Sequence, residues 1–398
     1  MNPSRRIQAL GVSPIRHLAP LARKAEERGV RVLPLNIGQP DLPTPRAYYE
    51  AIRSFDAPYT PYAPSQGLPE LLEAIREDFR VRGVALDPES ILVTAGGSEA
   101  LLFSLLTLCD PGDEVLVAEP FYTNYNFFAD TAGVKLVSVR TDPEEGYALP
   151  PDADLEARLS SRTRAVLVTN PNNPTGTVLP REDMERLGRF AARHDLFVLA
   201  DEVYRDFVYR EGGFVSFGEL EEVRDRLVIC DSVSKRFSAC GVRVGCLATP
   251  RLDLAALALK LGQGRLAVST VEQRGAAALY GQPPSFFAEQ REAYRVRRDA
   301  LVGALSRVEG VSCRVPEGAF YFMVRLGVED TSDFAAWMLR EFQHQGDTVM
   351  VAPGEGFYAT PGAGRDEVRV AYAIAPDRLV RAAEVLGRGL EAYRQLRP

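Results

Sequence analysis

Short apolar runs of strand length alternate with longer, helix-like segments through the middle of the chain. The runs are nearly continuous in Val, Leu and Ile, which is typical of strands buried on both faces of a sheet. The intervening segments include helix candidates at Ser98–Leu108 and Arg181–His194. This alternation predicts an α/β domain with a largely parallel sheet. The predicted strands are Ile91–Thr94, Glu114–Glu119, Val134–Val139, Ala165–Thr169, Leu196–Ala200, Leu227–Cys230 and Val244–Ala248.

The pattern changes in the last third of the chain. A long helix rich in Arg and Glu is predicted from Pro284 to about Val308, followed by strands near Ala319–Val324 and Val368–Ala373. The final segment repeats apolar residues at helical spacing, at Leu379, Ala383, Leu386, Leu390 and Tyr393. We therefore predict an N-terminal arm over residues 1–45, a large α/β domain over residues 46–285 and a small α+β domain over residues 286–398.

Charge and composition exclude several classes of protein. The 398 residues include 47 basic and 54 acidic side chains, giving a formal net charge of −7. A nucleic-acid-binding protein normally shows a basic balance or a basic stripe, and neither is visible. No window is long and apolar enough to cross a membrane, and the N-terminus does not have the pattern of a secretory signal. Small molecules or other proteins are therefore the expected partners.

Cysteine and histidine are too few, and too scattered, for several kinds of site. The five cysteines show no C-x-x-C spacing and the chain has three histidines. A disulfide framework, a metal cluster or a His-based triad therefore has little to build from. We expect a soluble cytoplasmic enzyme or binding protein that contains no metal.

Lysine is scarce: only four of the 47 basic residues are lysine. An amine nucleophile cannot be replaced by a guanidinium group, so each lysine is a candidate for chemistry. Lys235 lies between Ser232 and Arg243, directly after a predicted buried strand, where open parallel sheets bind their ligands. The hydroxyls, the amine and the guanidinium would form an anion site beside an amine. The alternative is a polar turn between two strands.

Three further polar segments follow predicted strands. The first places Gly97 and Ser98 before a predicted helix, where backbone N–H groups can approach a phosphate, although such a sequence is also a common N-cap. The second is the loop Asn170–Gly176, whose prolines fix its course and whose asparagine amides project from it; a plain turn is the alternative. The third is Asp201, which ends an apolar strand and should meet a cation or a protonated ring.

In this order, the four segments resemble the class I/II aminotransferases, which have fold type I and use pyridoxal phosphate. The motifs present are S-x-S-K followed by G-x-R-x-G, N-P-x-N-P-T-G, and D-E-x-Y. Residues 35–45 (LNIGQPDLPTP) look like the family's N-terminal substrate loop, and residues 368–372 (VRVAY) look like its carboxylate-binding strand. The resemblance covers essentially the whole chain. It implies a large, mostly parallel seven-stranded sheet domain and a smaller α+β domain.

The resemblance assigns roles around the cofactor, pyridoxal 5′-phosphate. It implies that Lys235 forms a Schiff base with the cofactor and later moves a proton on the substrate. Asp201 would pair with the pyridinium nitrogen, and Tyr204 and Asn173 would hydrogen-bond the phenolate oxygen. The residues implied to hold the phosphate are Gly97, Ser98, Ser232 and Arg243.

Other implied roles concern the ring, the partner subunit and the substrate. Tyr122 would stack on the ring where many relatives have Trp, although it could instead belong to the core. Tyr62 would reach the phosphate of a neighbouring subunit, which implies a homodimer with sites at the subunit interface; a surface tyrosine is the alternative. Arg369 would bind the substrate α-carboxylate, with Gly38 approaching it closely and Asn173 nearby.

The predicted function is transfer of an amino group from an L-amino acid to a 2-oxo acid, such as 2-oxoglutarate, by a ping-pong mechanism. A C–S lyase on the same scaffold and a non-catalytic regulatory protein that binds the cofactor are the alternatives. The texture of the sequence is similar to bacterial aspartate or aromatic aminotransferases, which favours aspartate as donor. Arg265 is a candidate for reading a distal carboxylate, against the alternative of a surface arginine at a helix end.

Overall fold

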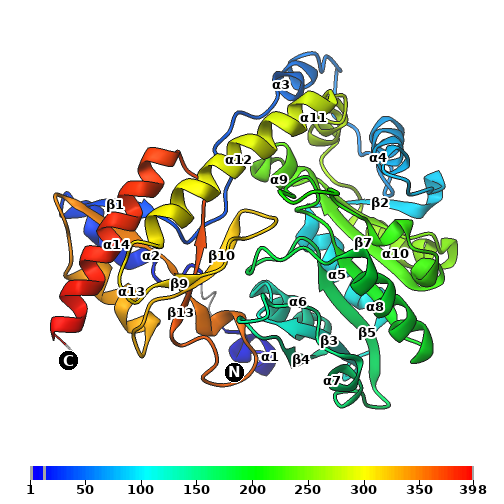
Figure 1. Cartoon of the computed structure of the whole chain (residues 1–398). Coiled ribbons are helices and arrows are strands. Elements are labelled where there is room, and N and C mark those ends of the chain that lie inside the picture. The colour runs from blue at the N-terminus through cyan, green and yellow to red at the C-terminus, as the bar shows by residue number, and fades with distance from the viewer. Residues whose placement is uncertain (1–2, 12–14, 397–398) are drawn as a thin grey trace.

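A seven-stranded sheet forms the centre of the larger part of the molecule (Figure 1). The computed structural model describes residues 3–11 and 15–396. The strand order is β2-β8-β7-β6-β5-β3-β4, and only β8 runs antiparallel to its neighbours, which confirms the prediction of a mostly parallel sheet. The strands are β2 (Ile91–Thr94), β3 (Glu114–Glu119), β4 (Lys135–Arg140), β5 (Thr163–Thr169), β6 (Phe197–Asp201), β7 (Leu227–Ser232) and β8 (Gly245–Ala248).

The sheet is buried on both faces because alternate side chains of a strand point to opposite sides. Within β7, Leu227 and Ile229 join one apolar cluster, whereas Val228 and Cys230 join another. Helices α4 (Pro69–Val81) and α8 (Arg181–Arg193) contribute to the first cluster. Helices α5 (Gly97–Leu108), α6 (Asn124–Ala132) and α10 (Leu252–Arg265) contribute to the second. The remaining helices here are α3 (Arg46–Arg53), α7 (Asp152–Glu156), α9 (Val233–Arg236) and α11 (Thr270–Leu279).

The smaller part of the molecule has its own apolar core and two small sheets. The four-stranded sheet is antiparallel, in the order β12 (Ala352–Pro353), β13 (Glu367–Ala371), β10 (Tyr321–Arg325) and β9 (Ser312–Cys313). The second sheet pairs β1 (Arg31–Pro34) with β11 (Asp347–Met350) in parallel. The helices of this smaller part are α2 (Ala19–Glu27), α12 (Pro284–Leu305), α13 (Thr331–Arg340) and α14 (Pro376–Leu396). This arrangement agrees with the expected α+β character.

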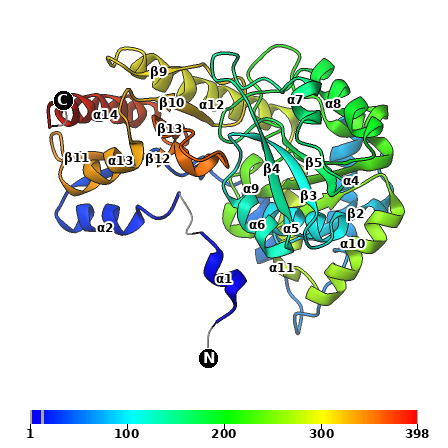
Figure 2. The ribbon, with the colours of Figure 1, turned by 90° about the horizontal axis from the view of Figure 1, so that it is seen from below.

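The N-terminal segment packs with these C-terminal elements. Strand β1 hydrogen-bonds to β11 and helix α2 packs on α13, so residues 19–34 complete the small core. Helix α12 runs from beside α11 to α14 and links the two parts of the molecule (Figure 1). Helix α1 (Arg5–Ala9) stands away from both parts (Figure 2). The domain limits at residues 45/46 and 285/286 stay a prediction.

Candidate active site

The predicted site residues meet in one cavity of about 600 Å³ between the two parts of the molecule. Of the thirteen candidate site residues that the sequence singles out, eleven line it, and Tyr62 and Arg265 do not. The eleven are Gly38, Gly97, Ser98, Tyr122, Asn173, Asp201, Tyr204, Ser232, Lys235, Arg243 and Arg369. A second cavity, of about 700 Å³, is lined by residues 143–148, 175–180 and 312–317 together with others, and it contains neither Lys235 nor Asp201. The chemistry therefore points to the smaller cavity.

Chain topology explains this meeting of residues. Strands β5, β6 and β7 are parallel neighbours, so their carboxyl ends lie at one edge of the sheet. Asp201 is the last residue of β6, Ser232 is the last residue of β7, and Asn173 follows β5. Ligands of open α/β sheets bind at this edge. The cavity therefore lies where the fold itself collects polar side chains.

An anion cradle forms where β2 leads into α5. Gly96 has a φ of 80°, in the left-handed region, and a Cβ there would lie 2.4 Å from the guanidinium of Arg243. Arg243 donates from Nη2 to the Ala95 carbonyl at 3.3 Å and from Nη1 to the Cys240 carbonyl at 3.0 Å. Gly97, Ser98 and Ser232 line the cavity together with Arg243, and Ser232 lies close to Gly97. A helix N-terminus, hydroxyls and a guanidinium together suit a phosphate group.

Asp201 is a buried carboxylate that has no ion pair among the residues the structure describes. Tyr125 donates to its Oδ2 at 2.6 Å, and the backbone N–H of Val203 donates to its Oδ1 at 3.3 Å. Burial raises the pKa of Asp201 to about 6, and the two hydrogen bonds only partly oppose this. A protonated ring nitrogen would supply the cation that the carboxylate lacks.

Lys235 lies on the short helix α9, whose N-cap is Ser232. Its Nζ donates to the Gly38 carbonyl at 2.9 Å and lies 4.0 Å from Cys240 Sγ. A Cβ at Gly38 would coincide with the Tyr321 hydroxyl, so only glycine fits there. The amine therefore faces the substrate-loop backbone across the cavity.

Arg369 is a buried cation without a carboxylate partner in the described chain. It is 2% exposed and lies between the rings of Tyr321 and Phe357, at 4.4 and 4.9 Å from their centroids. It donates from Nη1 to Asn173 Oδ1 at 3.0 Å and from Nη2 to the Asn36 carbonyl at 2.5 Å, while Nε has no partner. Burial lowers the pKa of this guanidinium but leaves it charged. The Arg369 guanidinium is therefore positioned to bind an anionic group.

Tyr321 is a site residue that the sequence did not reveal. Its hydroxyl lies 3.1 Å from that of Tyr204 and 3.3 Å from the Gly38 carbonyl, so it joins the substrate loop to the cavity wall. In the sequence it stands inside an apolar strand and looks like core. Tyr122 lines the cavity and packs edge-on against Tyr125, with ring centroids 5.4 Å apart.

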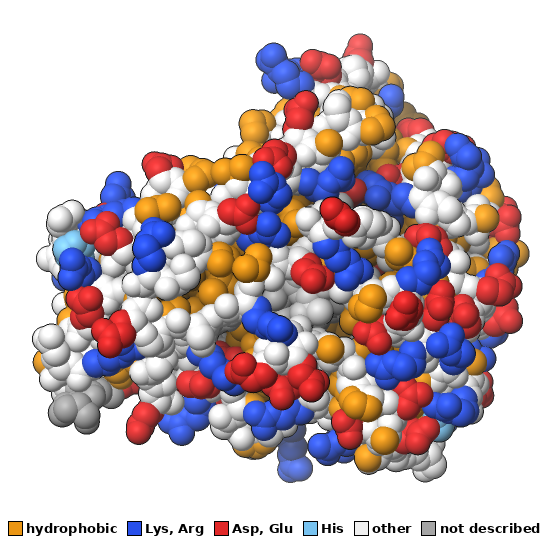
Figure 3. Space-filling view, viewed as in Figure 1, with side chains coloured by type: hydrophobic (Ala, Val, Ile, Leu, Met, Phe, Trp, Pro, Cys, Tyr) orange, Lys and Arg blue, Asp and Glu red, His pale blue; other side chains and the backbone are white. Residues whose placement is uncertain are grey.

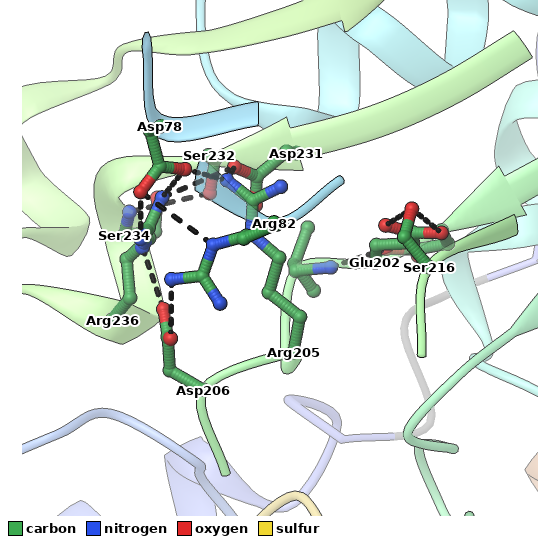
Figure 4. Close-up of polar contacts among 12 residues, drawn as sticks. Asp78, Arg82, Glu202, Arg205, Asp206, Ser216, Asp231, Ser232, Ser234 and Arg236 are labelled. Carbon is green, nitrogen blue, oxygen red and sulfur yellow. Dashed lines mark hydrogen bonds and ion pairs between the residues drawn. The ribbon is translucent and has the colours of Figure 1, made fainter. Parts of the chain in front are cut away.

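A buried ion network surrounds Arg236, the residue that follows Lys235 in the chain (Figure 4). Asp78 of α4 accepts two hydrogen bonds from Arg236, each of 2.8 Å, and one from Arg205 at 2.5 Å. Asp206 pairs with Arg236 at 2.7 Å, and Asp231 pairs with Arg205 at 2.7 Å. Burial opposes ionisation of Asp78, but its arginine partners hold the pKa of that carboxyl well below its usual range. The network ties the residues next to Lys235 and Tyr204 to the sheet and to α4.

Two sequence-based candidates lie outside the cavity. Tyr62 is 82% exposed, so it is available to another molecule rather than to this chain's own site. Arg265, the candidate for reading a distal carboxylate, does not line this cavity. Its Nη1 pairs with Glu99 at 3.0 Å, and its Nη2 donates to the Ser65 and Val93 carbonyls. These contacts occupy Nη1 and Nη2, whereas the buried Nε has no partner among the residues that the structure describes.

Residues 3–11 and 15–396 contain neither a cluster of metal-binding side chains nor a membrane-spanning helix. No group of three or more His, Cys, Asp or Glu side chains there could hold a metal ion, and no helix there is long and apolar enough to cross a bilayer. Acidic and basic side chains are interspersed over the face seen in Figure 3. That face therefore presents no broad basic surface of the kind that nucleic acids require.

Comparison with known proteins gives the family. The model of the family "Aminotransferase class I and II" matches residues 30–386. The chain belongs to the class I and II aminotransferases. An aspartate/prephenate aminotransferase from Thermus thermophilus is 36% identical over 395 residues, covering 97% of this aminotransferase and 99% of the relative. This confirms the prediction of a transaminase that uses pyridoxal phosphate.

Solved structures give the same answer for the fold of the aminotransferase. An aspartate aminotransferase from Thermus thermophilus with maleate has a TM-score of 0.89 at 32% identity, covering 98% of this chain and 100% of the other. An alanine aminotransferase from Pyrococcus furiosus also has a TM-score of 0.89, at 30% identity, covering 98% of this chain and 100% of the other. The fold therefore does not choose between these two amino donors.

The residues of the aminotransferase cavity fit pyridoxal 5′-phosphate. The cradle at Gly96 and Arg243 suits the phosphate, and the unpaired carboxylate of Asp201 suits a protonated pyridine nitrogen. Lys235 supplies the amine between them. The orphaned Nε of Arg369 leaves a further donor for the substrate.

Proposed function

We propose that this aminotransferase takes an amino group from a dicarboxylic L-amino acid, with aspartate as the first candidate, and delivers it to a 2-oxo acid such as 2-oxoglutarate. The observation that carries the proposal is that Lys235, Asp201 and Arg369 line one cavity, where neither Asp201 nor Arg369 forms an ion pair with any residue that the structure describes. Each of the two substrates would occupy the cavity in turn.

In the proposed site, the large part of the molecule holds the cofactor. Gly97, Ser98, Ser232 and Arg243 bind the phosphate, and Asp201 keeps the ring nitrogen protonated. Tyr204 and Asn173 would hold the ring through its phenolate oxygen, and Tyr122 would stack on it. When bound, pyridoxal 5′-phosphate supplies an electron sink that stabilises negative charge at the substrate Cα.

Substrate is held by Arg369 and moved by Lys235. The planar fork of Arg369 binds the α-carboxylate with two hydrogen bonds, which fixes the position of the Cα–H bond. Lys235 Nζ would take the proton from the substrate Cα and deliver it to C4′ of the cofactor. The Gly38 carbonyl accepts hydrogen bonds from both the Tyr321 hydroxyl and Lys235 Nζ, which fixes the Gly38 backbone beside the amine.

The choice of a dicarboxylic donor is supported by the relatives. The Thermus thermophilus relative is named for aspartate and prephenate, and the solved Thermus structure contains maleate, which carries two carboxylates. The test is a panel of amino donors, each with 2-oxoglutarate and with pyruvate. Aspartate or glutamate should have the highest kcat/KM. Release of ammonia and pyruvate without an acceptor would instead identify a C–S lyase, and cofactor binding without turnover would identify a regulatory protein.

The assembly is proposed to be a homodimer located in the cytoplasm. Tyr59 and Tyr62 are 72% and 82% exposed, and such exposed aromatic groups suit a subunit contact that reaches a second site. Helix α1 projects from the body in the manner of an exchanging arm (Figure 2). Light scattering gives the assembly directly. Mixing Tyr62→Ala with Lys235→Ala protein should restore part of the activity only if the sites are shared.

A further inference from the structure

The cavity contains more cations than the cofactor and a single carboxylate need. Its charged lining residues are Arg16, Lys235, Arg243 and Arg369, against one carboxylate, Asp201. In the proposed function, Arg243 meets the phosphate, Arg369 meets the α-carboxylate and Lys235 does the chemistry. Arg16 is the cation left over.

Arg16 also has no side-chain partner among the residues that the structure describes. None of the described residues forms an ion pair or side-chain hydrogen bond with its guanidinium, and the residue is exposed. Arg265, by contrast, is bound to Glu99 and to two backbone carbonyls. A free guanidinium on a cavity wall attracts an anionic group of the ligand.

The backbone that carries Arg16 is anchored on both sides. Asn36 Nδ2 donates to the Ile15 carbonyl at 3.3 Å, which ties the segment to the substrate loop. Leu18 is 3% exposed and belongs to the core of the smaller part. The Arg16 carbonyl accepts from the Ala19 N–H at 3.0 Å, at the start of α2. Arg16 therefore projects from a turn whose backbone is held in place. A side chain on such a turn can bind a substrate group at a defined position.

The charged residues of the cavity fall into two groups, one on the large part of the molecule and one on the small part. Asp201, Lys235 and Arg243 come from the large sheet and its loops, where the cofactor would be held. Arg369 and Arg16 come from elements that pack on the smaller core. Two cations on the substrate side correspond to two carboxylates on the substrate.

We propose that Arg16 binds the distal carboxylate of a dicarboxylic substrate and thereby sets the preference of this enzyme for such substrates. This inference rests on the proposed function, because it assigns Arg369 to the α-carboxylate. Donors with one carboxylate gain no binding energy from Arg16. Arg16 therefore raises the affinity for dicarboxylic donors relative to monocarboxylic ones.

The first experiment compares Arg16→Gln, Arg16→Lys and the control Arg23→Gln in the holoenzyme. Arg23 lies on α2, is exposed and does not line the cavity, so it repeats the change of charge on the same segment. For Arg16→Gln, the ratio of kcat/KM for aspartate to that for alanine should fall about 10- to 100-fold, as for a lost charge-assisted hydrogen bond. Arg16→Lys should restore part of the ratio, and Arg23→Gln should keep it. An unchanged ratio in Arg16→Gln, or an equal fall in Arg23→Gln, would overturn the proposal.

The second experiment measures binding without turnover. Calorimetric titration of the holoenzyme with succinate and with butyrate compares two ligands that differ by one carboxylate. Arg16→Gln should lower the affinity for succinate about 10-fold or more and leave the affinity for butyrate unchanged. Arg369→Lys should lower the affinity for both ligands. Equal loss of both ligands in Arg16→Gln would overturn the proposal. If the wild-type enzyme transfers no amino group from any donor, the proposed function fails, and the succinate titration still decides the role of Arg16.

Discussion

Lys235 and Arg236 are adjacent in the chain, but their charged groups have different surroundings. Lys235 Nζ meets the Gly38 carbonyl in the cavity, whereas Arg236 is 1% exposed and bound to Asp78 and Asp206 (Figure 4). Both residues belong to the single turn of α9. The ion network therefore fixes the backbone from which the reactive amine projects.

Asp78→Asn should destabilise the protein by about 3–5 kcal/mol, because it leaves Arg205 and Arg236 buried with one carboxylate fewer. Denaturant unfolding of the holoenzyme measures this loss. Glu73→Gln on the same helix breaks the exposed pair with Arg76 and should leave the midpoint where it is. Equal midpoints for the two variants would show that the network does not stabilise the fold.

Glu202→Gln should flatten the dependence of stability on pH. Glu202 is buried, accepts from Ser216 Oγ and the Phe217 N–H, and burial raises the pKa of its carboxyl to about 7. The folded state thus keeps a proton that the unfolded state releases near pH 4.5, so the contribution of this group is complete below pH 4.5 and is lost between pH 4.5 and 7. The loss is on the order of 3 kcal/mol. Unfolding midpoints at pH 5 and pH 8 should therefore differ less in the variant, and an unchanged difference would refute the assignment.

Asp201→Asn should leave the cofactor bound through its phosphate but slow the donor half-reaction. The ring nitrogen would lose the charge that keeps it protonated, and removal of one such electrostatic contact costs about 10²- to 10³-fold in rate. Absorbance of the cofactor during a single turnover measures the rate. Tyr125→Phe keeps the Asp201 carboxylate and removes the hydrogen bonds of the Tyr125 hydroxyl to Asp201 and Thr169, each of 2.6 Å, so it should have a smaller effect. Near-normal transfer by Asp201→Asn would exclude the role.

Arg369→Lys should lower kcat/KM for every amino donor by a similar factor. The variant keeps the charge but loses the two-pronged geometry, at a cost of about 1.5–3 kcal/mol. Arg365→Lys, at an exposed ion pair with Asp330, is the matched control. Selective loss of one class of donor would mean that Arg369 reads a side chain rather than the α-carboxylate.

The fold and most of the cavity could be predicted because the informative residues follow buried strands directly. Val and Leu runs mark β5, β6 and β7, and Asp201, Ser232 and Lys235 stand at or after their ends. Strand limits moved by one or two residues, as at β6, which starts at Phe197 rather than Leu196. That shift leaves the sheet unchanged.

Residues that meet only through tertiary structure could not be predicted. Arg16 is one of many arginines and lies in an irregular segment, and nothing local distinguishes it from Arg265. The difference between them is tertiary, because Glu99 pairs with Arg265, whereas no described carboxylate pairs with Arg16. Asp78 likewise belongs to an ordinary amphipathic helix until Arg205 and Arg236 pack against it.

The most direct test of the account is to reduce the holoenzyme with borohydride and locate the cofactor by peptide mass spectrometry. The chain offers only four lysines, Lys24, Lys135, Lys235 and Lys260, and among them only Lys235 lines the cavity. The account predicts a yellow protein whose absorbance band is lost on reduction, with the adduct on Lys235 alone. An adduct on Lys24, Lys135 or Lys260, or no adduct on any lysine, would contradict it.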